Sequence, residues 1–266
     1  MDIISHTLTG IAVGTVIATS DNGNWKRKSA IILLGGFAGG LPDFDAISLG
    51  SKFDTIIGSF FGLNHTGKQI YSGKFWYSHH AALHSMLAPV LLLLFSFLYI
   101  YLKGFFYKTK SIGKSIYTNK YLSISFLLGY IFHLFEDMPT PASVWGGVNF
   151  FFPNSDYIGG FGKIWWWNNY DLTLIIFLVI LVNLMVLIAP KIHKKTKSKL
   201  SLGVFSLGMG LFIFQIMTRP VDFSYTGHTT KYKEFEAESK RIQKEILGDR
   251  LYHFMVQIDD KIPVNF

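Results

Sequence analysis

The sequence contains no cysteine, and only 16% of its 266 residues are charged. Without cysteine the chain has no disulfide bonds and no thiolate metal sites, so any metal ion must be bound by His, Asp or Glu. Soluble domains are typically about a quarter charged, and the low share here argues against an ordinary cytosolic enzyme. Half of the residues are hydrophobic and 17% are aromatic, which excludes a disordered chain.

Six stretches are candidate membrane spans, because a span needs about 20 mostly apolar residues. They cover residues 3–19, 29–49, 82–102, 121–138, 172–189 and 200–217. The second and fourth carry polar residues near one end, and each either spans the membrane or is re-entrant. We therefore predict an all-α, polytopic membrane helix bundle of about six transmembrane helices in residues 1–217. A short extracytoplasmic tail, 218–266, follows, with a helix from Lys231 to Leu247 that stops at Gly248.

Basic residues are concentrated in three of the loops that join these segments. The three loops hold 13 of the 25 Lys and Arg residues, with one acidic residue, Asp21. The basic residues are Lys26, Arg27, Lys28, Lys103, Lys108, Lys110, Lys114, Lys120, Lys191, Lys194, Lys195, Lys197 and Lys199. Alternating spans place all three loops on one side, which the positive-inside rule makes cytoplasmic. Topology thus explains the net charge of +8, and we expect no nucleic-acid partner.

Histidine and aspartate are costly inside a membrane and usually mark function there. In this chain they gather at the ends of the first four segments: His6, then Asp43 and Asp45, then His79, His80 and His84, then His133 and Asp137. The orientation derived from Lys and Arg alone places all four groups on the extracytoplasmic side. This agreement is independent evidence that the groups form one site.

The spacing of these residues favours metal binding. His133 and Asp137 are four residues apart, as are His80 and His84, so each pair would share a helix face. We predict that the metal ligands are His6, Asp43, Asp45, His79, His84, His133 and Asp137. Histidine with carboxylate suits zinc, manganese or iron, and this many ligands allows two or more ions. Glu136 is predicted to act as a general base or to support a ligand.

The predicted loop 139–171 is dense in aromatic residues, including Trp145, Trp165, Trp166 and Trp167. Tryptophan and tyrosine favour the headgroup level of a bilayer. The loop is therefore predicted to lie on or in the outer leaflet. It serves there as an aromatic belt, as a docking place for a lipid substrate, or as both.

At these residues the chain resembles the YdjM-like family of predicted inner-membrane metal-dependent hydrolases. Met1-Asp2 with Ser5-His6 is similar to the family's Asp-x-x-Thr-His, and residues 41–45 match its Leu-Pro-Asp-x-Asp. Residues 79–85 are similar to His-Arg-Gly-x-Thr-His-Ser, and residues 133–140 to His-x-x-x-Asp-x-x-Thr. The resemblance covers about residues 1–153. The family in turn looks distantly similar to zinc-dependent phospholipase C enzymes and single-strand nucleases, which implies phosphoester chemistry.

The chain departs from the family pattern at His80, Ala81 and Leu83, where the family has Arg, Gly and Thr. The resemblance implies that His80 binds an anionic substrate group in place of that Arg, or adds a metal ligand. We expect a multi-pass inner-membrane hydrolase that cleaves a phosphoester in a lipid or lipid-linked substrate at the outer face. Two alternatives stay open: a metal-ion or small-solute transporter, and a non-catalytic protein with a structural metal site.

Overall fold

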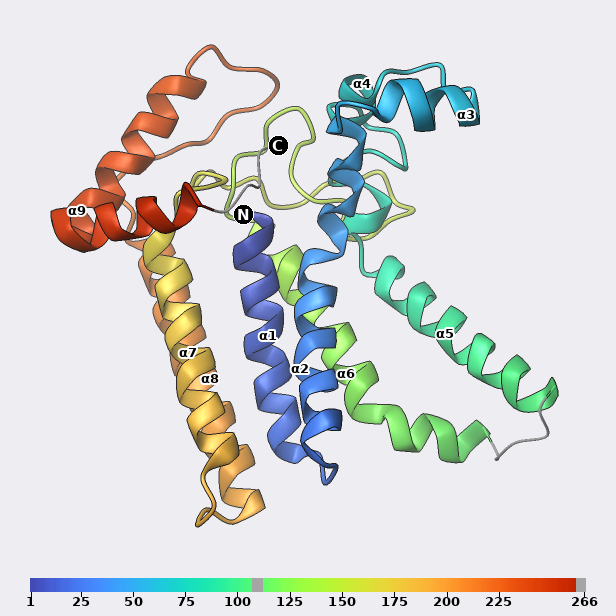
Figure 1. Cartoon of the computed structure of the whole chain (residues 1–266). Coiled ribbons are helices and arrows are strands. Elements are labelled where there is room, and N and C mark those ends of the chain that lie inside the picture. Colours follow the sequence, from blue (N-terminus) through green and yellow to red (C-terminus); the bar gives the residue numbers. More distant parts are fainter. Residues whose placement is uncertain (107–111, 262–266) are drawn as a thin grey trace.

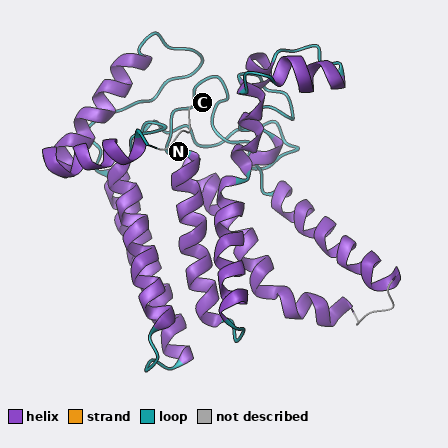
Figure 2. Ribbon diagram, viewed as in Figure 1, coloured by secondary structure: helices purple, strands orange, loops and turns teal. Residues whose placement is uncertain are grey.

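The structure is a computed structural model that describes residues 1–106 and 112–261. Its described residues form helices and loops, and they contain no strand beyond isolated bridges (Figure 2). This confirms the predicted all-α class. Lys108 and Lys110, which contributed to the predicted topology, lie outside the described residues.

The bundle is built around α1 (Ile3–Ser20), which packs against α2 (Trp25–Gly40), α6 (Ile112–Asp137), α7 (Tyr170–Ile188) and α8 (Lys194–Met217) (Figure 1). The long helix α5 (Leu87–Phe106) packs beside α6 and is exposed along most of its length. An exposed helix of this apolarity is what a lipid environment favours.

Four helices are long and apolar enough to cross a membrane: α1, α5, α7 and α8. A fifth span results if α2 and the 3-10 helix η1 (Pro42–Leu49), which meet at a bend of 49°, count as one. The bend follows from Pro42, because proline cannot continue the hydrogen bonding of α2. The predicted number of six spans is therefore approximate, since α6 does not reach the same apolarity among the described residues.

Glycines allow α1 and α2 to pack with their backbones in contact. A Cβ atom on Gly10 would clash with the carbonyl oxygen of Gly35, and one on Gly39 with the carbonyl oxygen of His6. Such small residues at helix interfaces are a common means of close packing in membranes. The close approach sets the beginning of α1 directly against the end of α2, which is where the polar residues lie.

The end of the bundle that carries the N-terminus is covered by the non-helical segments and short helices (Figure 1). These include η2 (Phe53–Gly58), α3 (Ser59–Phe61), α4 (Gly67–Tyr71), the short 3-10 helix η3 (Ala82–His84) and the loop between α6 and α7. The loops α1–α2 and α7–α8, which carry the basic residues, lie at the opposite end.

The aromatic loop between α6 and α7 is partly a core element. Trp165 is fully buried and packs with Phe223 and Ile242 from the tail, whereas Trp167 is 40% exposed. The tail helix α9 (Tyr232–Asp259) breaks at Gly248, whose φ of 72° is not helical. The predicted stop at Gly248 is thus a real break, but a second helical part, which was not predicted, follows it.

Candidate metal centre

The beginning of α1, the helix η1, the turn before α5 and the end of α6 meet at the end of the bundle that carries the N-terminus (Figure 1). They bring together the side chains of His6, Asp43, Asp45, His79, His80, His84, His133 and Asp137. All five histidines are buried, and so is Asp137. Residues up to 131 positions apart in sequence thus form one polar cluster inside an apolar bundle.

Four ligand atoms at the centre of this cluster lie within 4.8 Å of one another, and they come from Asp43, His84, His133 and Asp137. Asp137 Oδ2 is 3.1 Å from His133 Nε2 and 3.5 Å from His84 Nε2. Asp43 Oδ1 is 3.7 Å from His84 Nε2 and 3.8 Å from His133 Nε2. Tetrahedral zinc, with bonds near 2.1 Å, holds its ligand atoms about 3.4 Å apart. The spacing therefore fits one ion.

A second group shares His84 with the first and adds His79 and His80, again within 4.8 Å. His80 Nε2 is also 3.8 Å from Asp137 Oδ2. The two groups are therefore contiguous, and the arrangement has ligands enough for a second ion next to the first.

Four of the five histidines are anchored by a hydrogen bond from Nδ1 to an oxygen. The Nδ1 atom of His133 donates to the carbonyl oxygen of Gly39 at 2.6 Å, and that of His80 donates to the carbonyl oxygen of Gly147 at 2.9 Å. Such a bond fixes the tautomer and leaves Nε2 with its lone pair free. Anchoring of this kind is typical of histidines that bind metal.

Two carboxylates lie against Nδ1 of the remaining histidines. Asp45 accepts a hydrogen bond from His79 Nδ1 at 2.6 Å, and its other oxygen is 3.1 Å from His84 Nδ1. Glu136 accepts from His6 Nδ1 at 2.8 Å and from the hydroxyl of Thr9. Both oxygens of Glu136 are therefore engaged in orienting α1, which fits a supporting role better than proton transfer.

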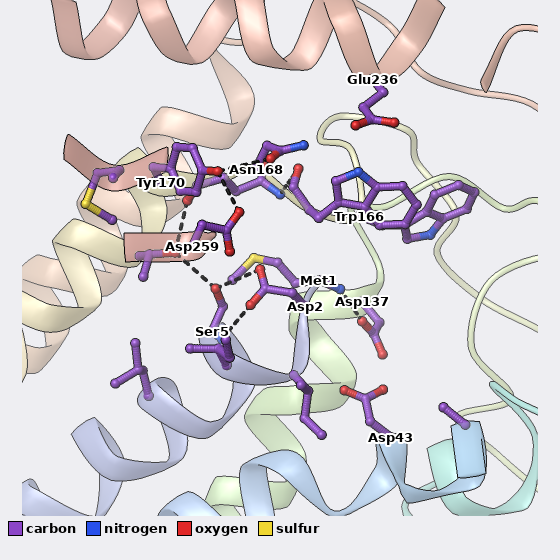
Figure 3. Close-up of a pocket in the computed structure, with 18 of the residues that line it drawn as sticks. Met1, Asp2, Ser5, Asp43, Asp137, Trp166, Asn168, Tyr170, Glu236 and Asp259 are labelled. Atoms are coloured by element: carbon purple, nitrogen blue, oxygen red, sulfur yellow. Dashed lines mark hydrogen bonds and ion pairs between the residues drawn. The ribbon is translucent and has the colours of Figure 1, made fainter. Parts of the chain in front are cut away.

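Several buried polar atoms of the cluster have no hydrogen-bond partner among the described residues. They are Nε2 of His6, both ring nitrogens of His84, Nε2 of His133, and one oxygen each of Asp45 and Asp137, Oδ2 in both cases. Buried polar atoms are nearly always satisfied, and Oδ2 of Asp137 lies 3.1 Å from Nε2 of His133 and 3.5 Å from Nε2 of His84. A divalent cation bound between these three atoms would satisfy them, so the residues present fit a metal. The amino group of Met1 also contacts Asp137, at 2.6 Å from Oδ1 (Figure 3).

The turn before α5 shows how strongly the cluster attracts positive charge. Burial lowers the pKa of His84, but the carboxylates of Asp45 and Asp43 more than offset this and raise the pKa to about 10. Burial, with His79 and His84 nearby, holds the pKa of His80 well below its ordinary value. His84 thus lies where a cation is stabilised, and His80 is a neutral imidazole.

The helical geometry predicted for His80 and His84 is wrong. The α5 helix begins at Leu87, and His80 has a φ of 61° in a turn that precedes η3. The backbone carbonyl of His80 accepts from the amide of Asn149, which holds the turn open. The turn, rather than a shared helix face, brings His79, His80 and His84 together.

The cluster forms one wall of a cavity of about 1030 Å³. Asp43, His79, His80 and Asp137 line the cavity, so the cluster is open on this side. Figure 3 shows Asp43 and Asp137 below Trp166, with Glu236 of α9 above it. An open position beside the ligands is the feature that separates catalytic from purely structural metal sites.

The contacts of Tyr71 and Trp145 with the histidine turn were not predicted from the sequence. The ring of Tyr71 stacks on His79 at 4.5 Å between centroids, and Trp145 lies 4.7 Å from His80. The indole N–H of Trp145 donates to the carbonyl oxygen of Tyr71. The only available signal was the aromatic density of the loop, which was interpreted as a membrane belt.

Comparison with protein families gives a match over residues 1–220, to the family described as YdjM inner membrane protein. Comparison with curated proteins and with solved structures gives no match. The matched range includes every residue of the polar cluster and ends just after α8. The chain therefore belongs to the YdjM inner membrane protein family, as a multi-pass protein of the inner membrane.

Proposed function

We propose that this protein is a metal-dependent hydrolase that cleaves a phosphoester in a lipid or lipid-linked substrate at the outer face of the inner membrane. The observation that carries the proposal is that the metal-ligand cluster opens into a cavity whose other walls come from α1, α7 and α9. A ligand set alone fits a structural site equally well. A ligand set beside a large, open cavity at the end of membrane helices is better suited to catalysis on a lipid.

Asp43, His84, His133 and Asp137 would hold the first ion, and His79 would contribute to a second. A bound divalent cation, zinc or manganese, supplies a more acidic water and neutralises phosphoryl oxygens. We assign proton acceptance to Nε2 of His80, because this side chain lines the cavity and its Nδ1 is engaged with the Gly147 carbonyl oxygen, which leaves the Nε2 lone pair free. Glu136 would orient His6 rather than transfer a proton.

The two alternative functions fit the arrangement less well. A transporter needs polar groups through the whole membrane depth, whereas this cluster is confined to one end of the bundle (Figure 1). A structural metal site is usually closed by its four ligands, whereas this cluster is open to a cavity on one side.

Hydrolysis is tested with the purified full chain in detergent micelles, loaded with zinc or manganese. We expect release of product from a phospholipid or an alkyl phosphodiester, and at least about a 100-fold loss of rate in Asp43→Asn, because a ligand is lost. Asp156→Asn is the matched control, since Asp156 lies on an exposed loop. Equal rates in both variants, or no turnover with any metal, would rule out the proposed reaction.

The side of the membrane on which the cluster lies is testable by labelling, because the chain has no cysteine of its own. We expect Asn154→Cys, at the end that carries the cluster, to react with a membrane-impermeant maleimide in intact cells with a permeabilised outer membrane. Lys195→Cys, an exposed residue at the opposite end, should react only after lysis. The reverse pattern would place the site in the cytoplasm.

A further inference from the structure

The cavity extends from the metal-ligand cluster into the bundle, between α1 and α7. Ile4 and Leu8, one turn apart on α1, line it on one side. Leu174 and Phe177, one turn apart on α7, line it on the other. We call the surface formed by these four side chains the α1–α7 groove. Both helices are apolar enough to span a membrane, so the groove lies at the depth of the lipid chains.

The groove reaches an exposed position on α7. Along α7 it runs from Tyr170 to Phe177, which is about 10 Å at 1.5 Å per residue. This is about a third of the roughly 30 Å hydrocarbon core of a bilayer. Phe177, at its far end, is 47% exposed. A chain in the groove can therefore continue into the bilayer beyond Phe177.

The second helical part of α9 covers the cavity where it meets the membrane surface. Phe254, Met255 and Ile258 line the cavity from this side. The hydroxyl of Tyr170, at the start of α7, donates to Asp259 at 2.7 Å (Figure 3). The break at Gly248 allows this part of α9 to turn onto the end of α7. Apolar side chains of α1, α7 and α9 thus all line the cavity.

Two residues that line the cavity carry a buried hydrogen-bond donor that has no partner among the described residues. The donors are the indole N–H of Trp166 and the amide Nδ2 of Asn168. Asn168 is 8% exposed, so an unpaired donor there is costly in the absence of a ligand. Both donors belong to the loop that enters α7, between the metal-ligand cluster and α9 (Figure 3). They suit acceptor oxygens of a lipid head group.

We propose that the cavity binds one membrane phospholipid-type molecule that enters sideways from the bilayer. One hydrocarbon chain lies in the α1–α7 groove. The phosphate lies beside the cation that Asp43 and Asp137 would hold, and its oxygens accept from the donors of Trp166 and Asn168. A volume of about 1030 Å³ is at the upper end of small-molecule sites and has room for a head group with part of one chain. This assignment deepens the proposed function and rests on its metal site, whereas lipid binding is measured separately from hydrolysis.

The test uses hexadecyl phosphate with a photoreactive diazirine in its chain, added to the zinc-loaded full-length protein in phosphatidylcholine nanodiscs. We expect cross-links to Leu8, Leu174 and Phe177, reduced by unlabelled hexadecyl phosphate and much less by hexyl phosphate or hexadecanol. Cross-links spread over α5 and the outer faces, with no competition, would overturn the proposal, because they would report bulk lipid contact only.

Variants test the groove and the head-group donors separately. Leu174→Trp fills the groove and should reduce the competed cross-linking at least about fivefold, whereas Leu178→Trp, on a 61% exposed position of the same helix, should not. Trp166→Phe removes only the N–H and should weaken competition by hexadecyl phosphate about tenfold, as expected for a hydrogen bond to a charged group. Equal effects of Leu174→Trp and Leu178→Trp would contradict the groove assignment.

The outcomes distinguish this inference from the proposed function. If cross-links are confined to the groove but no phosphoester is hydrolysed with any metal, the lipid site is supported and the hydrolase function is contradicted. If hydrolysis depends on metal but no cross-links form in the groove, the hydrolase function is supported and the lipid site is contradicted. Thermal unfolding of each variant in the same nanodiscs identifies any that fail to fold.

Discussion

Asp137→Asn is expected to reduce zinc affinity by well over 100-fold while the protein stays folded. Asp137 is the residue on which the cluster converges: Oδ2 lies 3.1 Å from His133 Nε2 and 3.5 Å from His84 Nε2, and Oδ1 lies 3.0 Å from His6 Nε2. Loss of a group that merely orients a ligand typically costs 10–100-fold in affinity. Loss of a shared ligand oxygen should cost more. Affinity is measured by competition with a chromogenic chelator.

The control for this variant is Asp222→Asn, which changes an exposed aspartate of the tail. A second measurement distinguishes a metal ligand from a purely structural residue: the rise in melting temperature when metal is added. Binding only to the folded state raises stability by about 2.7 kcal/mol at 100 times Kd, which the wild type and the control should show as a higher melting temperature. If Asp137→Asn keeps that shift, the carboxylate is not a ligand.

Asp171→Ala is expected to destabilise the protein by about 3–5 kcal/mol, because it leaves a buried arginine unpaired. Asp171, at the start of α7, accepts from Arg219 at 2.8 Å, from Gln215 at 2.9 Å and from Gln243 at 2.9 Å. Arg219 follows α8 and its side chain is 3% exposed, and Gln243 lies on α9. One carboxylate thus joins three helices and holds the tail on the bundle. Thermal unfolding in detergent measures the loss, and trypsin cleavage in the tail reports its release.

Two further variants separate the buried ion pair from a general sensitivity to substitution. Glu245→Ala removes the exposed contact with Arg241 and should cost at most about 1 kcal/mol. The double variant Asp171→Leu with Arg219→Met should recover most of the stability, since apolar side chains can replace a buried ion pair. A destabilisation of Asp171→Ala no greater than that of Glu245→Ala would show that the ion pair does not hold the tail.

The sequence predicted the elements and the polar cluster because both depend on local patterns. The apolar runs gave helices at nearly the observed positions, such as 172–189 for α7 (Tyr170–Ile188). The grouping of His6, Asp43, His84 and Asp137 followed from topology alone, since alternating spans bring segment ends together. No knowledge of helix packing was needed for that step.

Other features depend on long-range contacts that no local pattern encodes. The anchoring of His133 by the Gly39 carbonyl and of His80 by the Gly147 carbonyl joins residues 94 and 67 positions apart. The turn at His80 needs a positive φ that spacing cannot reveal. The hydrogen bonds of Asp171 with Arg219 and Gln243 form only once α7, α8 and α9 are packed together.

The central claim is that the buried histidines and aspartates bind a divalent cation. The most direct measurement is the metal content of the purified wild-type protein by inductively coupled plasma mass spectrometry, after loading with zinc or manganese and removal of free ions. The arrangement of the two ligand groups that share His84 predicts one or two tightly bound ions per chain. A folded protein that has been incubated with zinc or manganese and still contains no bound metal would contradict the account.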